Sequence, residues 1–506
     1  MARCDLSNAE LLDPDPNPDP DPNPDPNLDP GHESAGSSQS SHRLLAYSDA
    51  LISIIATVMI LPVAHTAVET NEELRQSLQV LLSTKIAVFL MTFLIVSMAW
   101  AAHSRLFQVI VRIDDSLALF NLVCMMLITL LPYTFSLMAS FPEHVLGILL
   151  FCSCVMVIGM VQTVIVIYAF RRPHLLHQRL QGSPHLPEYQ HHLLRVILRV
   201  PLMCLLASLA AAVCFQLSYV LLAVVIFLPY MSSWLQWLRI KVLGPEEEPA
   251  GELLLYSFLP HEPVSKERLE AFSDGVYAIV ATLLILDICE DNVPDPSVVS
   301  QRFNGSLVLA LRSYGPEYLA YFGSFATVGL LWFVHHSLFL HVTKVTRLMG
   351  LLNTFSLAFV GGLPLAYQLT HEFPRHSQNE LEAIQISCVI IFFAGLFQLC
   401  IWVVALHSQK ECLGPAVRYG GREHLLMFAK LWLYPCVALG TFLLTCVLSQ
   451  FSSPIFHLME LTVPVAFLLL RLLLRLLLAL RHSLLQRPSS STLPSAADSE
   501  NTFGPI

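Results

Sequence analysis

The feature that most constrains the fold is a series of twelve apolar stretches of roughly 20 residues each. A helix needs about 20 consecutive apolar residues to cross the hydrocarbon core of a bilayer. Only 13% of the 506 residues are charged, whereas soluble domains carry about 25%. We therefore predict an all-α polytopic membrane protein in a lipid bilayer. The predicted spans are 44–66, 82–103, 114–138, 145–170, 193–215, 217–240, 268–289, 316–340, 346–370, 382–406, 424–449 and 454–481.

The chain also contains an internal duplication. Residues 43–50, Arg-Leu-Leu-Ala-Tyr-Ser-Asp-Ala, return 225 positions later as residues 268–275, Arg-Leu-Glu-Ala-Phe-Ser-Asp-Gly. Two further matches follow in the same order at an offset of 232, namely a Trp-x-x-His pair and an Asn with a Pro eleven residues later. Each copy holds six predicted spans. Since six is even, both copies have the same orientation, related by an axis along the membrane normal.

These repeats define the predicted domains. The first repeat covers 43–241 and the second 266–482, joined by a linker at 242–265. The N-terminal tail, 1–42, is rich in Pro, Asp and Asn and has little to bury, so we predict disorder. The C-terminal tail, 483–506, is rich in Ser and Pro, and the same prediction applies.

The distribution of basic residues predicts the orientation. Cytosolic loops carry an excess of Lys and Arg, which places both termini in the cytosol. The only N-x-S/T sequon, at Asn304, falls on the opposite side, where glycosylation can reach it. The basic residues on the side of the termini are Arg171, Arg172, Arg179, Arg239, Lys241, Lys266, Lys344, Arg347 and Arg487.

Several classes of function have no support in the sequence. No basic patch interleaved with aromatic residues indicates nucleic-acid binding, and no catalytic or nucleotide-binding motif indicates an enzyme. The cysteines form no CxxC pair, so we expect neither a metal site nor a cofactor. Arg471, Arg475 and Arg481 are too sparse for a voltage sensor and are expected to snorkel to the interface. A TVGYG-type carbonyl filter is also absent.

The repeated Arg and Asp residues are the first candidates for function, because ionisable residues in membrane helices are rarely incidental. Asp49 and Asp274 need partners, and the repeated Trp, His and Asn residues can supply them. We interpret the set as a hydrogen-bond network that holds the first helix of each repeat, and a proton relay is the alternative. Its members are Arg43, Ser48, Asp49, Trp100, His103, Asn121, Arg268, Ser273, Asp274, Trp332, His335 and Asn353.

The same two helices carry a polar stripe. Ser53 and Thr57 share one helical face, with Ile54 beside them, and Thr282 and Ile279 hold the matching positions in the second copy. Hydroxyls interrupted by a bulky isoleucine favour a water-lined pore with a hydrophobic constriction. The alternative is that the hydroxyls only pack against neighbouring helices.

At the far ends of these helices lie His65 and Asp287. Histidine titrates between about pH 5 and 8, so a residue facing an acidic lumen can sense pH. The alternative is that His65 is simply an interfacial residue.

The Arg-x-x-x-Phe/Tyr-Ser-Asp motif at the start of two six-helix repeats resembles the endosomal and lysosomal potassium channels of the transmembrane protein 175 family. The resemblance covers roughly residues 43–482. It implies a homodimer in which the first helix of each repeat lines one central pore. Two helices cannot enclose a channel, whereas four can. It also implies that Ile54 and Ile279 form the constriction.

The resemblance further implies a potassium leak across endosomal and lysosomal membranes, with proton conduction when the lumen is acidic. Such a channel would contribute to the membrane potential and luminal pH of the organelle. A proton-coupled secondary transporter is the first alternative, but the pore-helix midpoints are Ile and Thr rather than a charged substrate site. A membrane scaffold that docks a cytosolic regulatory protein is the second alternative.

Overall fold

The computed structural model describes residues 33–61, 75–177, 180, 181, 186–224, 238, 265–291, 293–372, 378–418, 423–448 and 451–485. Within these ranges the regular structure is helical. Two isolated β-bridges, Ile110 with Leu176 and Val342 with Leu413, occupy matching places after the second predicted span of each repeat.

The helices of the first repeat contribute to an apolar core that continues into the second repeat. Their bounds are α1 (Glu33–Val58), α3 (Arg75–Val109), α4 (Asp115–Ile128), α5 (Leu131–Ser140), α6 (Val145–Arg171) and α7 (Leu186–Ala211).

The helices of the second repeat follow the same order, with a short helical excursion inserted after the first helix. They are α10 (Lys266–Asp291), α11 (Pro296–Arg302), α12 (Leu307–Ser313), α13 (Gly315–His341), α14 (Arg347–Val360), α15 (Leu363–Glu372), α16 (Gln378–His407), α17 (Gln409–Cys412), α18 (His424–Val447) and α19 (Ser452–Leu485).

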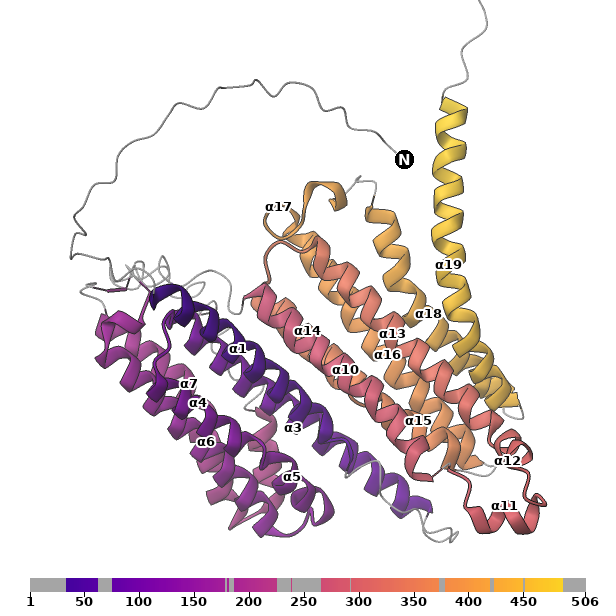
Figure 1. Ribbon diagram of the computed structural model, residues 1–506, viewed down its shortest axis with the longest axis horizontal. Helices are drawn as coiled ribbons and strands as arrows, with labels where there is room; N and C mark the ends of the chain where they lie inside the picture. Colours follow the sequence, from indigo (N-terminus) through magenta and orange to yellow (C-terminus); the bar gives the residue numbers. More distant parts are fainter. Residues whose placement is uncertain are drawn as a thin grey trace, which may run out of the picture.

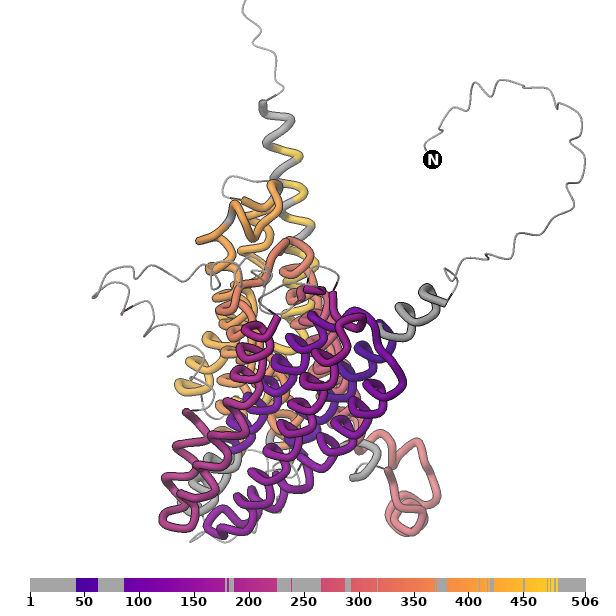
Figure 2. The backbone as a smooth tube through the Cα atoms, turned by 90° about the vertical axis from the view of Figure 1, so that its left-hand side faces the viewer, coloured from indigo at the N-terminus to yellow at the C-terminus, as the bar shows by residue number. Residues whose placement is uncertain are grey.

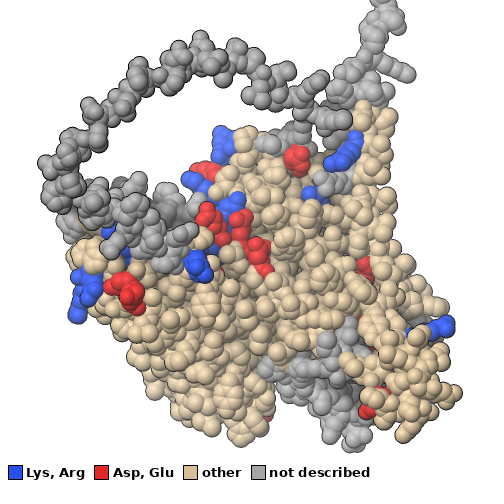
Figure 3. Space-filling model, viewed as in Figure 1, with Lys and Arg blue, Asp and Glu red and all other residues tan. Residues whose placement is uncertain are grey.

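Ten helices in the described ranges are long and apolar enough to cross a membrane. Of the twelve predicted spans, the first is described only as far as residue 61, and the sixth only as the short helix Phe215–Val224 and residue 238. The charged side chains on the face shown in Figure 3 gather towards one end, and a broad uncharged surface extends beside them. This surface suits a bilayer.

Proline divides the third and ninth predicted spans. The stretches 114–138 and 346–370 were each predicted as one helix, but α5 and α15 start anew with Pro132 and Pro364 near their first residues. Proline lacks the amide hydrogen and its ring clashes with the preceding turn, which favours a break at these positions, although α7 and α18 continue through an interior proline. Each pair still forms one candidate span.

The start of α1 differs from the prediction. The helix begins at Glu33, so residues 33–42 are helical where a disordered tail was expected. The Asp/Asn-Pro repeat ends at Pro30, and the Ser-rich segment after Glu33 contains no proline that would stop the helix. Residues 1–32, most of the linker and residues 486–506 lie outside the described part of the chain.

The first helices of the two repeats meet at the centre of the molecule. α1 packs against α10, and α14 also contacts α3, which joins the two halves. Figure 1 shows the remaining first-repeat helices on one side of this junction and the second-repeat helices on the other. Figure 2 shows that α19 extends beyond the other helices at one end. The junction places the two motif-bearing helices side by side.

Candidate functional site

The first copy of the motif is bound to the two following spans by buried side-chain hydrogen bonds. Trp100 Nε1 of α3 donates to Asp49 Oδ1 at 2.8 Å. Asn121 Nδ2 of α4 donates to Ser48 Oγ at 3.0 Å, and its Oδ1 lies 2.8 Å from His103 Nε2. The five side chains are at most 2% exposed. The network therefore fixes α1 against α3 and α4.

The second copy repeats these bonds. Trp332 Nε1 donates to Asp274 Oδ1 at 2.8 Å, and Asn353 Nδ2 donates to Ser273 Oγ at 3.0 Å. His335 Nε2 lies 2.8 Å from Asn353 Oδ1. The two motifs thus build the same local structure twice.

Arg268 connects the two copies. Its Nε and Nη2 donate to the two carboxylate oxygens of Asp49 at 2.9 and 2.6 Å, and its Nη1 donates to the carbonyl oxygen of Ser104 at 3.2 Å. The side chains of Arg268 and Asp49 are 12% and 2% exposed. A bidentate arginine–carboxylate pair is among the strongest charge-assisted contacts. The arginine of the second repeat therefore neutralises the aspartate of the first.

His103 lies between Asn121 and Arg268. Asn121 Oδ1 can only accept, so His103 Nε2 carries the proton, and in the neutral ring Nδ1 is the acceptor. Arg268 Nη2 lies 3.4 Å from that Nδ1. A neutral imidazole therefore fits both neighbours.

Two further contacts bring α10 close to the first repeat. The ring of Phe272 stacks on Trp100 with centroids 4.3 Å apart. A Cβ added at Gly275 would lie 2.1 Å from Ser53 Oγ, so only glycine fits against α1 here. Tyr47 and Ala50 occupy the positions of Phe272 and Gly275 in the first copy.

The repeat-equivalent surfaces, one on α1 and one on α10, make no such contact within the chain. Arg43, Tyr47 and Ala50 are exposed on α1, and Asp274 is exposed on α10. Tyr47 is 52% exposed, whereas its counterpart Phe272 is 1% exposed. Among the described residues, no ion pair reaches Arg43 or Asp274. In a single chain, therefore, this open face of α1 and the open face of α10 each lack a partner helix, whereas the equivalent faces in the other repeat pack on each other.

The predicted pore residues divide into an exposed or partly exposed group and a buried group. Ile54 is 36% exposed, Thr282 is exposed and Ile279 is partly buried. Ser53 and Thr57 are fully buried, and Gly275 of α10 lies against Ser53.

The pore-helix hydroxyls donate their protons to carbonyl oxygens of their own helices. Ser53 donates to Ala50, Thr57 to Ser53 and Ile54, and Thr282 to Ile279. The oxygen lone pairs alone are left to accept from water or to bind a cation.

The remaining predicted residues lie away from this network or beyond the description. His65 lies outside the described residues, and the side chain of Asp287 is likewise not described. Asn304 is exposed in the turn between α11 and α12, with a backbone φ of 48°. Arg475 is exposed on α19. The described residues contain no group of three metal-ligating side chains.

The sequence reasoning missed a buried carboxylate in the last span. Glu460 of α19 is 4% exposed and accepts hydrogen bonds from Ser324 Oγ at 2.9 Å and His457 Nδ1 at 3.2 Å. The signal was a single acidic residue inside the apolar stretch 454–481. It also missed the buried Gln162 and Gln398, polar residues within the fourth and tenth spans.

Comparison with known proteins identifies relatives over most of the chain. The sequence model of the family described as endosomal/lysosomal potassium channel TMEM175 matches residues 43–132 and 268–364, the two stretches that carry the network. The endosomal/lysosomal proton channel TMEM175 of Danio rerio is 71% identical over 449 residues, covering 88% of this chain and 86% of the relative. The Homo sapiens protein of the same name is 61% identical over 448 residues, covering 88% and 89%.

A solved structure also matches. The crystal structure of a lysosomal potassium-selective channel TMEM175 homolog from Chamaesiphon minutus is 26% identical, covers 40% of this chain and 97% of that chain, and gives a TM-score of 0.33.

Proposed function

The chain belongs to the TMEM175 family of endosomal/lysosomal channels, and on that premise we propose that it conducts potassium ions and protons passively across endosomal and lysosomal membranes. It is an ion channel rather than an enzyme. The conduction path that we propose is a central pore formed by two copies of the chain, with α1 and α10 of each copy around it.

The observation that carries this proposal is the one-sided contact between α1 and α10. One face of α10, with Arg268, Phe272 and Gly275, packs on the face of α1 with Asp49 and Ser53. Such a head-to-tail contact joins two different surfaces, and repeating it closes a ring if the rotation allows. The unused faces are the open face of α1 and the open face of α10. A second chain supplies the complement of each.

The helix geometry supports a ring of four. Successive residues are about 100° apart around a helix. The α10-facing residues Asp49, Ser53 and Thr57 and the open-face residues Tyr47, Ala50 and Ile54 then have mean directions about 90° apart. That is the angle between the two contacts of each member in a square arrangement. Two chains would therefore enclose one pore with pseudo-fourfold symmetry.

The residues at the adjoining edges of the two faces border the axis of this ring. On α1 they are Ser53 and Thr57 from the α10-facing side and Ile54 from the open side, and on α10 they include Ile279 and Thr282. The burial of Ser53 and Thr57 in one chain agrees with a place at the seam between neighbouring pore helices. Rings of isoleucine side chains narrow a pore and expel water from it. We propose that Ile54 and Ile279 form the constriction and that the hydroxyls lie next to it.

We propose the full membrane arrangement from the same repeat. Each repeat contributes six spans in the same orientation, twelve in all, with both termini in the cytosol. Basic residues near Arg171, Arg347 and Lys344 support this orientation, since cytosolic loops carry the excess of Lys and Arg. The network at Asp49 and Asp274 then lies at the cytosolic end of the pore helices.

Recording from enlarged lysosomes of cells that express the chain tests the proposal. A channel gives large currents that reverse at the potassium equilibrium potential, and a proton component appears when the luminal solution is made acidic. A coupled transporter instead saturates at low turnover with a fixed ratio of substrate to proton. The second outcome, or no current above that of untransfected cells, would refute passive conduction.

A further inference from the structure

Basic side chains gather where the two repeats meet, at one end of the membrane spans. α3 packs against both α7 of the first repeat and α14 of the second, which brings these three helices together. Four arginines on them lie close enough to one histidine of α7 for their charges to act on it. We call these five residues the basic cluster; they are Arg105 of α3, His192, Arg195 and Arg199 of α7, and Arg347 of α14.

Two members of the basic cluster have no acidic partner. Among the described residues, no ion pair joins Arg195 or Arg199 to a carboxylate. The two arginines are four residues apart and so share one face of α7, with Arg195 exposed and Arg199 half-buried. Like charges at this spacing destabilise a helix. The fold therefore holds a repulsion here that an anion from outside the chain would relieve.

Arg199 also lies within the membrane span. It stands six residues beyond the start of the predicted span 193–215, which is about 9 Å along a helix. An arginine at this depth is costly unless it meets an anion or its side chain extends to the interface. Extension to the interface leaves its guanidinium beside the positive charge of Arg195. A negative charge next to the two arginines removes both difficulties.

The second repeat has no such cluster. Pro201 of α7 and Pro435 of α18 are counterparts, because each lies inside its helix and against a glycine of the preceding long helix, Gly159 or Gly395. The resulting offset of 234, and the offset of 232 for α3, place uncharged residues at the matching positions, namely Ser337, Leu426, Ala429 and Leu433. Packing of these helices therefore does not require the basic residues.

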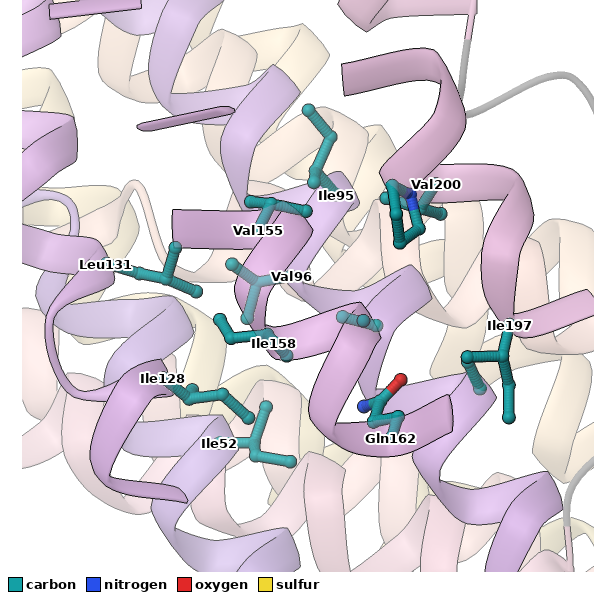
Figure 4. Close-up of a pocket in the computed structure, with 14 residues that line it drawn as sticks. Ile52, Ile95, Val96, Ile128, Leu131, Val155, Ile158, Gln162, Ile197 and Val200 are labelled. Atoms are coloured by element: carbon teal, nitrogen blue, oxygen red, sulfur yellow. The ribbon is translucent and has the colours of Figure 1, made fainter. Parts of the chain in front are cut away.

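An apolar surface continues from the two arginines along α7. The opposite side of this helix is turned inward, where Ile197 and Val200 line a small, mostly apolar space with residues of α6 (Figure 4). On the outer side, Leu202 and Leu206 follow the two arginines on the same face, and they are 57% and 44% exposed. A charged end above an exposed apolar face matches a lipid, whose headgroup lies at the interface and whose acyl chains lie beside the helix.

We propose that the basic cluster binds the headgroup of a phosphoinositide, a membrane lipid that carries a phosphomonoester, and that Leu202 and Leu206 contact its acyl chains. Guanidinium groups bind phosphate in a bidentate manner. Arg195 and Arg199 together need two negative charges, which this headgroup supplies and the singly charged phosphatidylserine does not. Basic pockets between membrane helices bind such headgroups in other proteins. The bound lipid then joins α7 of the first repeat to α14 of the second.

Native mass spectrometry of the purified full-length protein in detergent tests this site, with phosphatidylinositol 4-phosphate as the probe. The wild type should bind the probe about tenfold more tightly than phosphatidylserine with the same acyl chains, because of the additional charge. It should also bind the probe about tenfold more tightly than soluble inositol 1,4-bisphosphate, the headgroup without its chains, because apolar contacts are then lost. The orientation proposed above decides only which leaflet supplies the lipid, and binding in detergent depends on neither orientation nor conduction.

The arginines are tested by substitution. Arg195→Gln combined with Arg199→Gln should weaken binding of the probe about 25-fold, since each basic residue near a headgroup contributes about fivefold. The matched control is Arg112→Gln combined with Arg171→Gln. These two arginines are exposed near the same ends of α3 and α6 but outside the basic cluster, so the control removes the same charge and should bind as the wild type does.

Four results would each overturn the proposal. In the wild type they are equal binding of phosphatidylserine and the probe, or equal binding of the soluble headgroup and the probe. In the variants they are wild-type binding after loss of Arg195 and Arg199, or an equal loss of binding in the control. The wild-type comparisons need no substitution, so they keep the test decisive should the double variant fail to fold.

Discussion

The carboxylate of Asp49 accepts hydrogen bonds from the indole of Trp100 and from two nitrogens of Arg268, and it is almost completely buried. A buried ion pair contributes little net stability, because desolvation offsets the attraction. Removing one partner is different, since the remaining charge is then uncompensated. The pair therefore specifies which face of α10 meets α1.

Arg268→Gln should destabilise the folded chain by about 3–5 kcal/mol, because it leaves the Asp49 carboxylate buried without its counterion. Thermal unfolding in detergent, followed by tryptophan fluorescence, measures the effect. Adding Asp49→Asn should recover much of the lost stability. Arg43→Gln is the matched control, since Arg43 is exposed in the single chain. Equal destabilisation by both arginine substitutions in the monomeric protein would contradict the assignment.

Ile54→Asn or Ile279→Asn should hydrate the constriction and raise the permeability of sodium relative to potassium, because a polar side chain removes the dewetted barrier. Reversal potentials under bi-ionic conditions give the ratio. Ile54→Leu keeps the volume and polarity of the side chain and should leave the ratio unchanged. Unaltered selectivity in both asparagine variants would remove these isoleucines from the constriction.

Much of the network was accessible from the sequence at this scale. The repeated Trp, His and Asn residues were predicted as partners of the aspartates, and the structure confirms this for the tryptophans in both copies. The histidines and asparagines lie in the same network, but they bind each other and the motif serines instead of the aspartates. The link from Arg268 to Asp49 was not predicted. Residues six apart on one helix differ in direction by about 240°, so the arginine and the aspartate of one motif do not pair with each other. Each needs a partner on another helix, and a sequence does not say which helix lies beside which.

Among the elements, the two pore helices approach each other closely. Gly275 permits it, since any side chain there would collide with Ser53 Oγ. The interruptions of the third and ninth spans at Pro132 and Pro364 follow from proline chemistry and were open to prediction. Helix contacts were not, because lipid tails are as apolar as the side chains and the hydrophobic pattern alone does not select partners.

Gly275→Val should separate α1 from α10, lower the thermal stability of the protein and reduce its potassium current, since a side chain would stand 2.1 Å from Ser53 Oγ. Combining it with Ser53→Gly should recover part of both. Gly329→Val on α13 is the control, because nothing lies within 4 Å of a Cβ added there. If the two single variants behave alike, the helix contact does not depend on this glycine.

For the whole molecule, the predicted orientation places the α11–α12 loop in the lumen. Asn304 is exposed in this loop, so the protein from mammalian cells should carry an N-linked glycan. Glycosidase treatment should increase its electrophoretic mobility, and Asn304→Gln or Ser306→Ala should produce the same change without the enzyme. Identical mobility of all forms would argue against a luminal position of this loop.

The all-helical membrane fold and the internal repeat were readable at this scale because each depends on local sequence. The homodimer stays a prediction, since a single chain completes only one of the two contacts that each pore helix offers. The open faces of α1 and α10 carry alanines where the closed contact has Gly275 and Ser53, so Ala50 would meet Ala278 of the second copy.

Disulfide trapping of these two positions tests the ring of pore helices most directly. A Cβ at Gly275 would stand 3.0 Å from Ser53 Cβ. If the alanine-bearing faces meet only slightly farther apart, their Cβ atoms reach the separation of about 3.5–4.5 Å that a disulfide needs. In mildly oxidised membranes the double variant Ala50→Cys, Ala278→Cys should therefore migrate as a covalent dimer that reductant separates, whereas either single variant should remain monomeric. A double variant that stays monomeric, or single variants that dimerise equally well, would contradict a pore built from two chains.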